Sequence, residues 1–262
     1  MTTAAVMPQA RSLPKFGGFT LGMIKLELRR MMRNRRTVIF TFIMPAVFFL
    51  LFGTNGKSRN EAVGAGNVTG YIMVSMAVYG AMLATTSGGA MVSIERAAGW
   101  SRQLRLTPLK PVAYIAVKLV LAMVIGAVSV AVTFAVGSAS GAELPVHAWI
   151  ECALLAWVCA LVFAAFGLFM GYLLPSENVM QILGPVLAVL AFAGGLFAPL
   201  DTFGHTFATI AKFTPVYGVG ELARHPLTHD GNLWLAVANV AAWTLIFSVG
   251  AMWRFRRDTA RV

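Results

Sequence analysis

Three stretches carry residue types that support chemistry in other proteins, and each lacks the spacing that this chemistry needs. Residues 53–58 end in Gly-Lys-Ser, but only two residues separate their glycines, where a phosphate-binding loop has four. His225 and His229 lie four residues apart, yet Pro226 is expected to interrupt the helix between them and no third ligand is near. Residues 137–141 place alanine where a nucleophile elbow has serine. We therefore expect no catalytic residue and no metal site, and we do not expect an enzyme.

Long apolar stretches make up most of this sequence and are expected to form its structural elements. The chain is 58% hydrophobic and 12% charged, against about 45–50% and 25% for soluble domains. This composition predicts a single all-α domain embedded in a membrane. Runs of ~17–25 apolar residues can cross the bilayer. They place six transmembrane helices at residues 37–53 (with a kink at Pro45), 67–94, 112–138, 149–174, 179–200 and 233–255.

Basic residues mark one side of the expected membrane domain. Seventeen of the 21 lysines and arginines precede the first span, lie in or beside the 95–111 loop, or follow the sixth span. Because positive residues favour the cytoplasmic side, we expect both termini and that loop in the cytoplasm and the protein in the cell membrane. Anionic lipid headgroups and topology account for the net charge of +11, so we expect no nucleic-acid partner.

A basic amphipathic helix is expected before the first span. Apolar residues of this segment share one helical face, while Lys25, Arg29, Arg33 and Arg36 recur on another. Such a helix lies in the headgroup plane, either as a topology anchor or as a lever towards a cytoplasmic partner, and the two interpretations are compatible. The expected organisation is a flexible N-terminus (1–15), this interfacial helix (16–36), the six-span bundle (37–255) and a basic cytoplasmic tail (256–262).

The loop between the second and third spans mixes charged and apolar residues before two prolines end it. A short amphipathic helix at this place is suited to docking in a groove. A solvated basic turn explains the charges equally well, so spacing alone leaves both interpretations open.

The same loop resembles the cytoplasmic segment of ABC-2 type transporter permeases, and the drug-resistance permeases of the daunorubicin type are closest in character. The matching elements are Glu95-Arg96, Gly99, Leu106-Thr107-Pro108 and Lys118, followed by a glycine-to-proline span exit at 194–199, Thr214-Pro215-Val216-Tyr217 and a terminal arginine at Arg224. The second proline that the family carries after the span exit is missing from residues 200–205. This departure weakens the assignment to a subgroup.

The resemblance implies a half-transporter that pairs with a second permease, identical or homologous, and with two separate ABC ATPase subunits. The chain itself would hold no cofactor, because ATP and Mg would bind to the ATPases. The expected ATPase-coupling residues are Glu95, Arg96, Gly99, Trp100, Arg102, Leu104, Arg105, Leu106 and Pro108. The resemblance also nominates an uncharged substrate path along the first and fifth spans, formed by Phe42, Phe48, Phe49, Phe192 and Phe197. Such a path fits the export of an amphipathic or lipophilic compound, as in drug efflux.

Three further features predict how the spans connect and pack. Apolar residues at 203, 207, 210 and 213 predict a short helix in the long connection before the last span, and the family forms re-entrant outer helices there. Gly167 and Gly171 allow close helix approach, which we interpret as packing inside the bundle rather than between permeases. Cys152 and Cys159 are about 10 Å apart along a helix, so we expect apolar packing and no disulfide.

A different class of transporter is the alternative. A secondary transporter or channel, not driven by ATP, normally needs ionisable groups buried in the middle of its spans. In this sequence they stand near span ends, at Lys118, Glu143, Glu151 and Glu177. A membrane enzyme would need a convergent catalytic set, which the sequence does not provide.

Overall fold

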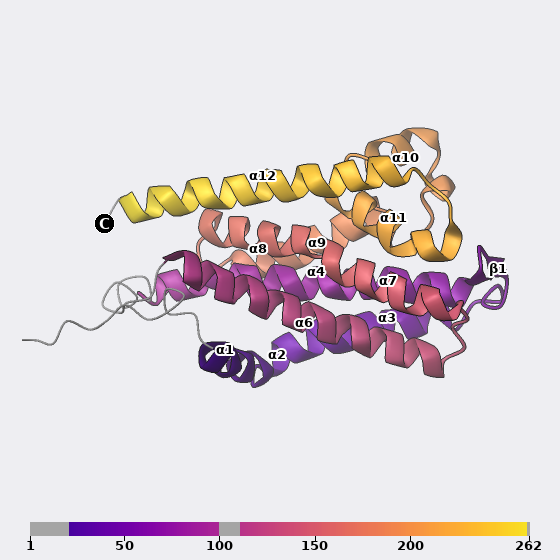
Figure 1. Ribbon diagram of the computed structural model, residues 1–262, viewed down its shortest axis with the longest axis horizontal. Coiled ribbons are helices and arrows are strands. Elements are labelled where there is room, and N and C mark those ends of the chain that lie inside the picture. The colour runs from indigo at the N-terminus through magenta and orange to yellow at the C-terminus, as the bar shows by residue number, and fades with distance from the viewer. Residues whose placement is uncertain (1–20, 100–110, 261–262) are drawn as a thin grey trace, which may run out of the picture.

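The computed structural model describes residues 21–99 and 111–260, which form an elongated helical bundle (Figure 1). Its described α-helices are α1 (Leu21–Met32), α2 (Arg35–Val38), α3 (Met44–Gly53), α4 (Val68–Ala97), α6 (Pro111–Ala139), α7 (Val146–Cys159), α8 (Leu161–Leu173), α9 (Val179–Ala193), α10 (His205–Ala211), α11 (Pro215–Thr228) and α12 (Leu233–Ala260). A π-helical turn, η2 (Ile39–Ile43), joins α2 to α3, and a 3-10 turn, η3 (Leu200–Phe203), precedes α10. Strands β1 (Ala62–Val63) and β2 (Gly66–Asn67) pair antiparallel.

The two ends of the bundle differ in what they carry (Figure 1). At one end lies α1, beside the last turn of α4 and the first turns of α6, and we call this the α1 end. At the opposite end lie α10 and α11, and we call this the α11 end. Helix α4 runs between the two ends through the middle of the bundle, and most of its residues are buried.

Four helical stretches among the described residues are long and apolar enough to cross a membrane, at 68–97, 113–139, 146–173 and 233–257. The other two expected spans are shorter in the structure. The apolar stretch Ile39–Gly53 and helix α9 each fall below that length, and the 15 residues of α9 rise about 22 Å against about 30 Å of hydrocarbon. The expectation of six full-length spans is therefore confirmed for four of them.

Several boundaries differ from those expected. Helix α4 continues to Ala97, so Glu95 and Arg96 belong to its last turn and not to a loop. Helix α12 continues to Ala260, through most of the stretch expected to be a tail. The expected fourth span consists of two helices, α7 and α8, that meet at Ala160. Residues 1–20, to which the flexible N-terminus was assigned, lie outside the described residues.

Helices α4 and α8 approach each other backbone to backbone. A Cβ atom at Gly167 would lie 2.3 Å from the Thr86 carbonyl oxygen, and one at Gly89 would lie 2.5 Å from the Leu168 amide nitrogen. Neither distance leaves room for a side chain. The prediction that the Gly167–Gly171 pair packs inside the bundle is confirmed, as is that of buried, unpaired Cys152 and Cys159.

The α-helix of the first apolar stretch is interrupted next to Pro45, where the π-helical turn η2 leads into α3. Pro45 has no amide hydrogen to give to the carbonyl of Thr41, four residues earlier. The hydroxyl of Ser129 on α6 donates to that carbonyl at 2.8 Å. Gly80 on α4 makes room for both residues, since a Cβ there would lie 2.5 Å from Ser129 Oγ and 3.0 Å from Pro45 Cγ. The π-helical turn Ile39–Ile43 immediately precedes this junction.

Candidate functional site

A buried group of charged residues joins three helices at the α1 end. Lys118 on α6 places its Nζ 2.5 Å from Oε1 of Glu95 on α4 and 3.3 Å from Oε2 of Glu27 on α1. The three side chains are 2%, 4% and 14% exposed, respectively. Burying an ammonium group without a partner costs free energy. Here α4 and α1 each provide one carboxylate as a partner for Lys118.

Two further residues complete this group, which we call the Lys118 cluster (Glu27, Arg30, Glu95, Tyr114 and Lys118). The hydroxyl of Tyr114, one turn before Lys118, donates to Oε2 of Glu95. Nη1 of Arg30 lies 3.7 Å from Oε1 of Glu95 from the exposed side of α1. Two positive and two negative charges balance, which allows the cluster to be buried. It fixes α1 to the place where α4 ends and α6 begins.

The structure describes three of the expected coupling residues, and both charged ones among them contact other parts of this chain. Glu95 belongs to the Lys118 cluster. Arg96 donates from Nη1 to the carbonyls of Gly171 and Tyr172, both at 3.2 Å, at the C-terminal end of α8. Gly99 has a φ of +74°, which ends the helical path. Trp100, Arg102, Leu104, Arg105, Leu106 and Pro108 lie outside the described residues. Contacts of this set with another protein stay a prediction.

The expected amphipathic helix is present as α1, and its apolar side faces protein. Met31 is buried with Phe42, Leu121 and Ile125, and Leu28 packs against this group. Lys25, Arg29 and Arg33 are exposed, while the side chain of Arg36 on α2 lies outside the described residues. Glu27 is on the packed side, where it reaches Lys118.

The role of Glu27 and Tyr114 could not be read from the sequence. Lys118 was visible as a lysine near the start of an apolar stretch, and this was the one available signal. Its partners lie 23 residues away at Glu95 and on a separate helix at Glu27. Separations of this size leave no local spacing rule by which the contact could be recognised.

Two of the expected substrate-path phenylalanines are buried, and the other three are partly exposed or exposed. Phe42 and Phe49 are inside the chain, with 7% and no exposure. Phe48 and Phe197 meet at 6.0 Å between ring centroids, and Phe197 also contacts Phe52 at 6.3 Å and Tyr79 at 5.1 Å. We call Phe48, Phe52, Tyr79 and Phe197 the aromatic cluster. Phe192 is 45% exposed and contacts Phe203 on η3.

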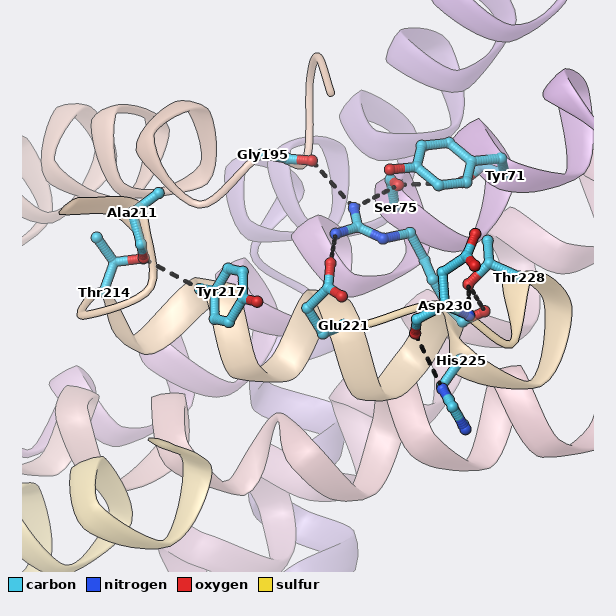
Figure 2. Close-up of polar contacts among 11 residues, drawn as sticks. Tyr71, Ser75, Gly195, Ala211, Thr214, Tyr217, Glu221, His225, Thr228 and Asp230 are labelled. Atoms are coloured by element: carbon cyan, nitrogen blue, oxygen red, sulfur yellow. Dashed lines mark hydrogen bonds and ion pairs between the residues drawn. The ribbon is translucent and has the colours of Figure 1, made fainter. Parts of the chain in front are cut away.

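A second buried polar group lies at the α11 end, around Arg224 of α11. Arg224 is 3% exposed, and its guanidinium donates to the Gly195 carbonyl at 3.0 Å, to Ser75 Oγ at 3.3 Å and to Glu221 Oε1 at 3.1 Å. The guanidinium also lies 5.0 Å from the ring centre of Tyr71. Figure 2 shows these partners converging from three elements: Tyr71 and Ser75 from α4, Gly195 from the segment after α9, and Glu221 from α11 itself.

Short helices occupy the connection before α12, as the apolar spacing predicted. Thr214 caps α11 by accepting from the Tyr217 amide, and α11 then continues through Pro226 to Thr228. The expectation that Pro226 interrupts this helix was wrong. The carbonyl of Leu222 loses one amide partner there, which a helix near its end tolerates. His225 and His229 lie 6.1 Å apart between ring centroids, and no group of three metal-binding side chains occurs among the residues that the structure describes.

Comparison with known proteins agrees with these features. The sequence profile described as "ABC-2 type transporter" matches residues 20–227, which is most of the chain. The chain is also similar to a curated protein of Bacillus subtilis (strain 168), named "Putative transport permease YvfS". The two are 27% identical over 237 residues, covering 89% of this chain and 96% of the relative.

Proposed function

Because the chain belongs to the ABC-2 type transporter family, as a permease subunit without ATPase activity, we propose that it exports an amphipathic or lipophilic compound by coupling to separate ATPases at its α1 end. Permeases of this family are multi-pass membrane proteins that function with ABC ATPase subunits. The proposal concerns the direction of transport, the class of cargo and the place of coupling.

The observation that carries the proposal is the Lys118 cluster. The segment between α4 and α6 begins one turn after Glu95 and ends shortly before Tyr114. Glu95, Lys118 and Glu27 connect both borders of this segment to α1. A force applied by an ATPase to residues 98–110 would therefore reach α1, α4 and α6 together. Glu95 acts in this proposal as an internal link, and Arg102 and Arg105 as the contacts with the ATPase.

The distribution of exposed charge supports a cytoplasmic α1 end and hence cytoplasmic termini. Exposed basic residues at the α1 end far outnumber acidic ones: they are Lys25, Arg29, Arg30, Arg33, Arg35, Arg256 and Arg257, against Glu177. At the α11 end, exposed basic and acidic residues nearly balance: they are Lys57, Arg59 and Lys212 against Glu61, Glu143, Glu151 and Asp230. In this orientation Ile39–Gly53 and α9 serve as two further spans, shortened by their irregular ends, and η3, α10 and α11 form the outer re-entrant layer.

The character of the first and fifth apolar stretches supports the proposed cargo class. Phe52 and Phe192 are 53% and 45% exposed, and the described side chains between 38 and 53 and between 179 and 200 include no charged group. A second permease, identical or homologous, would face these surfaces and enclose an uncharged path. Such a path suits an amphipathic or lipophilic molecule better than an ion. Phe48, Phe52, Phe192 and Phe197 are its proposed lining, and the buried Phe42 and Phe49 support it from behind.

Charge reversal tests the coupling proposal. The variant Arg102→Glu with Arg105→Glu is expected to insert normally into the membrane. The ATPase activity that is recovered with the tagged chain is expected to fall about tenfold or more. Lys57→Glu with Arg59→Glu is the matched control at the opposite end and is expected to change nothing. Unchanged co-purification and export in the Arg102/Arg105 variant would contradict the proposal.

A further inference from the structure

We propose that Arg224 is a positioning residue that holds the segment after α9 against α4 and thereby keeps Phe197 inside the aromatic cluster. This inference rests on the proposed function at one point, namely that the aromatic cluster closes the α11 end of the cargo path. The contacts of Arg224 and Phe197 all lie within this chain and involve no other protein. Arg224 is the terminal arginine of the pattern recognised in the sequence, and the coupling proposal gives it no role.

The guanidinium is the right group for this position because it makes separate bonds in different directions. Nη1 reaches both Gly195 and Ser75, and Nη2 reaches Glu221, which is three residues away on the same helix. Glu221 is 25% exposed and thus keeps the charge of the buried arginine balanced from the side of the solvent. A lysine would keep the charge, but its single nitrogen cannot occupy both the Nη1 and the Nη2 positions from which these bonds are made.

The segment that Arg224 holds has no regular structure of its own. Helix α9 ends at Ala193, and Gly195 follows with a φ of +75°, which glycine adopts without strain. A Cβ atom at Gly194 would lie 2.5 Å from the side chain of Val216 on α11. The segment is therefore pressed against α11, and the bond from Arg224 to the Gly195 carbonyl fixes its path.

That path determines where Phe197 lies. Phe197 follows Gly195 by two residues, and Leu196 between them is buried. On the other side of the contact, Ser75 precedes Tyr79 on α4 by one helical turn, so both point to similar faces. Arg224 thus binds the segment that carries Phe197 and the helix that carries Tyr79, and the two rings meet at 5.1 Å. Loss of Arg224 should release Phe197 without a direct change to any ring.

Cysteine labelling tests this inference on the full chain in lipid nanodiscs. Ala198→Cys places a thiol beside Phe197, and the reagent is a soluble maleimide that reaches both faces of the disc. We expect Arg224→Gln to speed labelling at position 198 about tenfold, Arg224→Lys to give an intermediate rate, and Ser75→Ala to raise the rate about twofold. Ser75→Ala removes the bond from Arg224 and the bond from the Ser75 hydroxyl to the Tyr71 carbonyl, but no charge. It therefore tests the inference if the Arg224 variants fail to fold.

The native cysteines report whether the bundle stays packed. Cys152 and Cys159 are 0% and 7% exposed and are expected to stay unlabelled in every variant. Equal labelling of position 198 with and without Arg224 would overturn the inference. So would labelling of Cys152 and Cys159 in parallel with position 198 in the Ser75→Ala variant, because it would show a general loosening. Neither ATPase nor cargo is needed, so failure of the coupling proposal would leave this result unaffected, and the reverse also holds.

Discussion

Nζ of Lys118 and Oε1 of Glu95 lie 2.5 Å apart across the interface between α6 and α4, and neither side chain is more than 4% exposed. Both residues belong to the sequence elements that resemble ABC-2 type permeases. In the sequence they appear as a loop acid and a span lysine without any connection. In the structure they form one ion pair, which gives these two elements a shared physical reason to be present.

Removal of the lysine should destabilise the protein strongly. Lys118→Met leaves Glu95 and Glu27 without their buried partner, at a cost of about 3–5 kcal/mol. We expect a large drop in the melting temperature of the purified chain. Lys118→Met combined with Glu95→Gln and Glu27→Gln should recover part of the loss, because no buried charge is left unpaired and the side chain of Arg30 is 59% exposed.

Lys25 provides the control for this change. It lies exposed on α1, and Lys25→Met removes the same charge without touching the Lys118 cluster. Equal melting temperatures for Lys118→Met and Lys25→Met would show that the cluster does not stabilise the fold.

The close contact of α4 and α8 predicts opposite outcomes at two helical glycines. Gly167→Ala would place a methyl group 2.3 Å from the Thr86 carbonyl oxygen and is expected to abolish monodisperse folded protein. Gly184→Ala on α9 meets nothing within 4 Å and should raise stability slightly, since alanine favours helix. Size-exclusion profiles of the two variants measure the difference, and a folded Gly167→Ala protein would contradict the structure.

The hydroxyl of Ser129 should matter because of Pro45. Ser129→Ala leaves the Thr41 carbonyl without this donor and is expected to cost about 1–2 kcal/mol. In a Pro45→Ala background the cost should be smaller, since the new amide can supply a donor. A double-mutant cycle on thermal stability measures this coupling. Ser138→Ala, which removes an exposed hydroxyl bonded to the Ala135 carbonyl, is the control, and additive effects at Ser129 and Pro45 would refute the interpretation.

Neighbouring phenylalanines on α3 should separate stability from transport. Phe49 is fully buried, so Phe49→Ala is expected to cost about 3–5 kcal/mol and to reduce the yield of folded protein. Phe48 is half-buried in the aromatic cluster, so Phe48→Ala should fold and lose cargo transport. Both are measured as melting temperature and as cargo export by membrane vesicles. Full export by Phe48→Ala would remove the aromatic cluster from the path.

Helical class, family and several elements could be predicted because they depend on local composition and spacing. The long apolar runs predicted the four helices of spanning length, and Pro45 lies next to the π-helical turn that interrupts the first stretch. The apolar residues from Phe203 to Phe213 indicated the helix that appears as α10. Each of these signals lies within one stretch of chain, where hydropathy and backbone rules act directly.

The polar clusters could not be predicted because their partners are distant in sequence and their surroundings are uniformly apolar. Arg224 and Ser75 lie 149 residues apart. A membrane helix is apolar towards lipid and towards protein, so hydropathy does not tell which side is packed. The break at Ala160 was missed for a related reason, since no proline or glycine marks it. Glu95 was placed in a loop because charge at the end of an apolar run reads as the edge of the membrane.

The direct backbone contacts at Gly89 and Gly167 between α4 and α8 limit which parts of the permease can move. Flexible side chains at an interface can change rotamer as two helices slide, whereas backbone atoms in direct contact cannot adjust. Helices α4 and α8 should therefore keep one relative position throughout transport. The rearrangements of the transport cycle then fall to α3 and α9, whose irregular ends and side-chain contacts allow them to shift around this fixed pair.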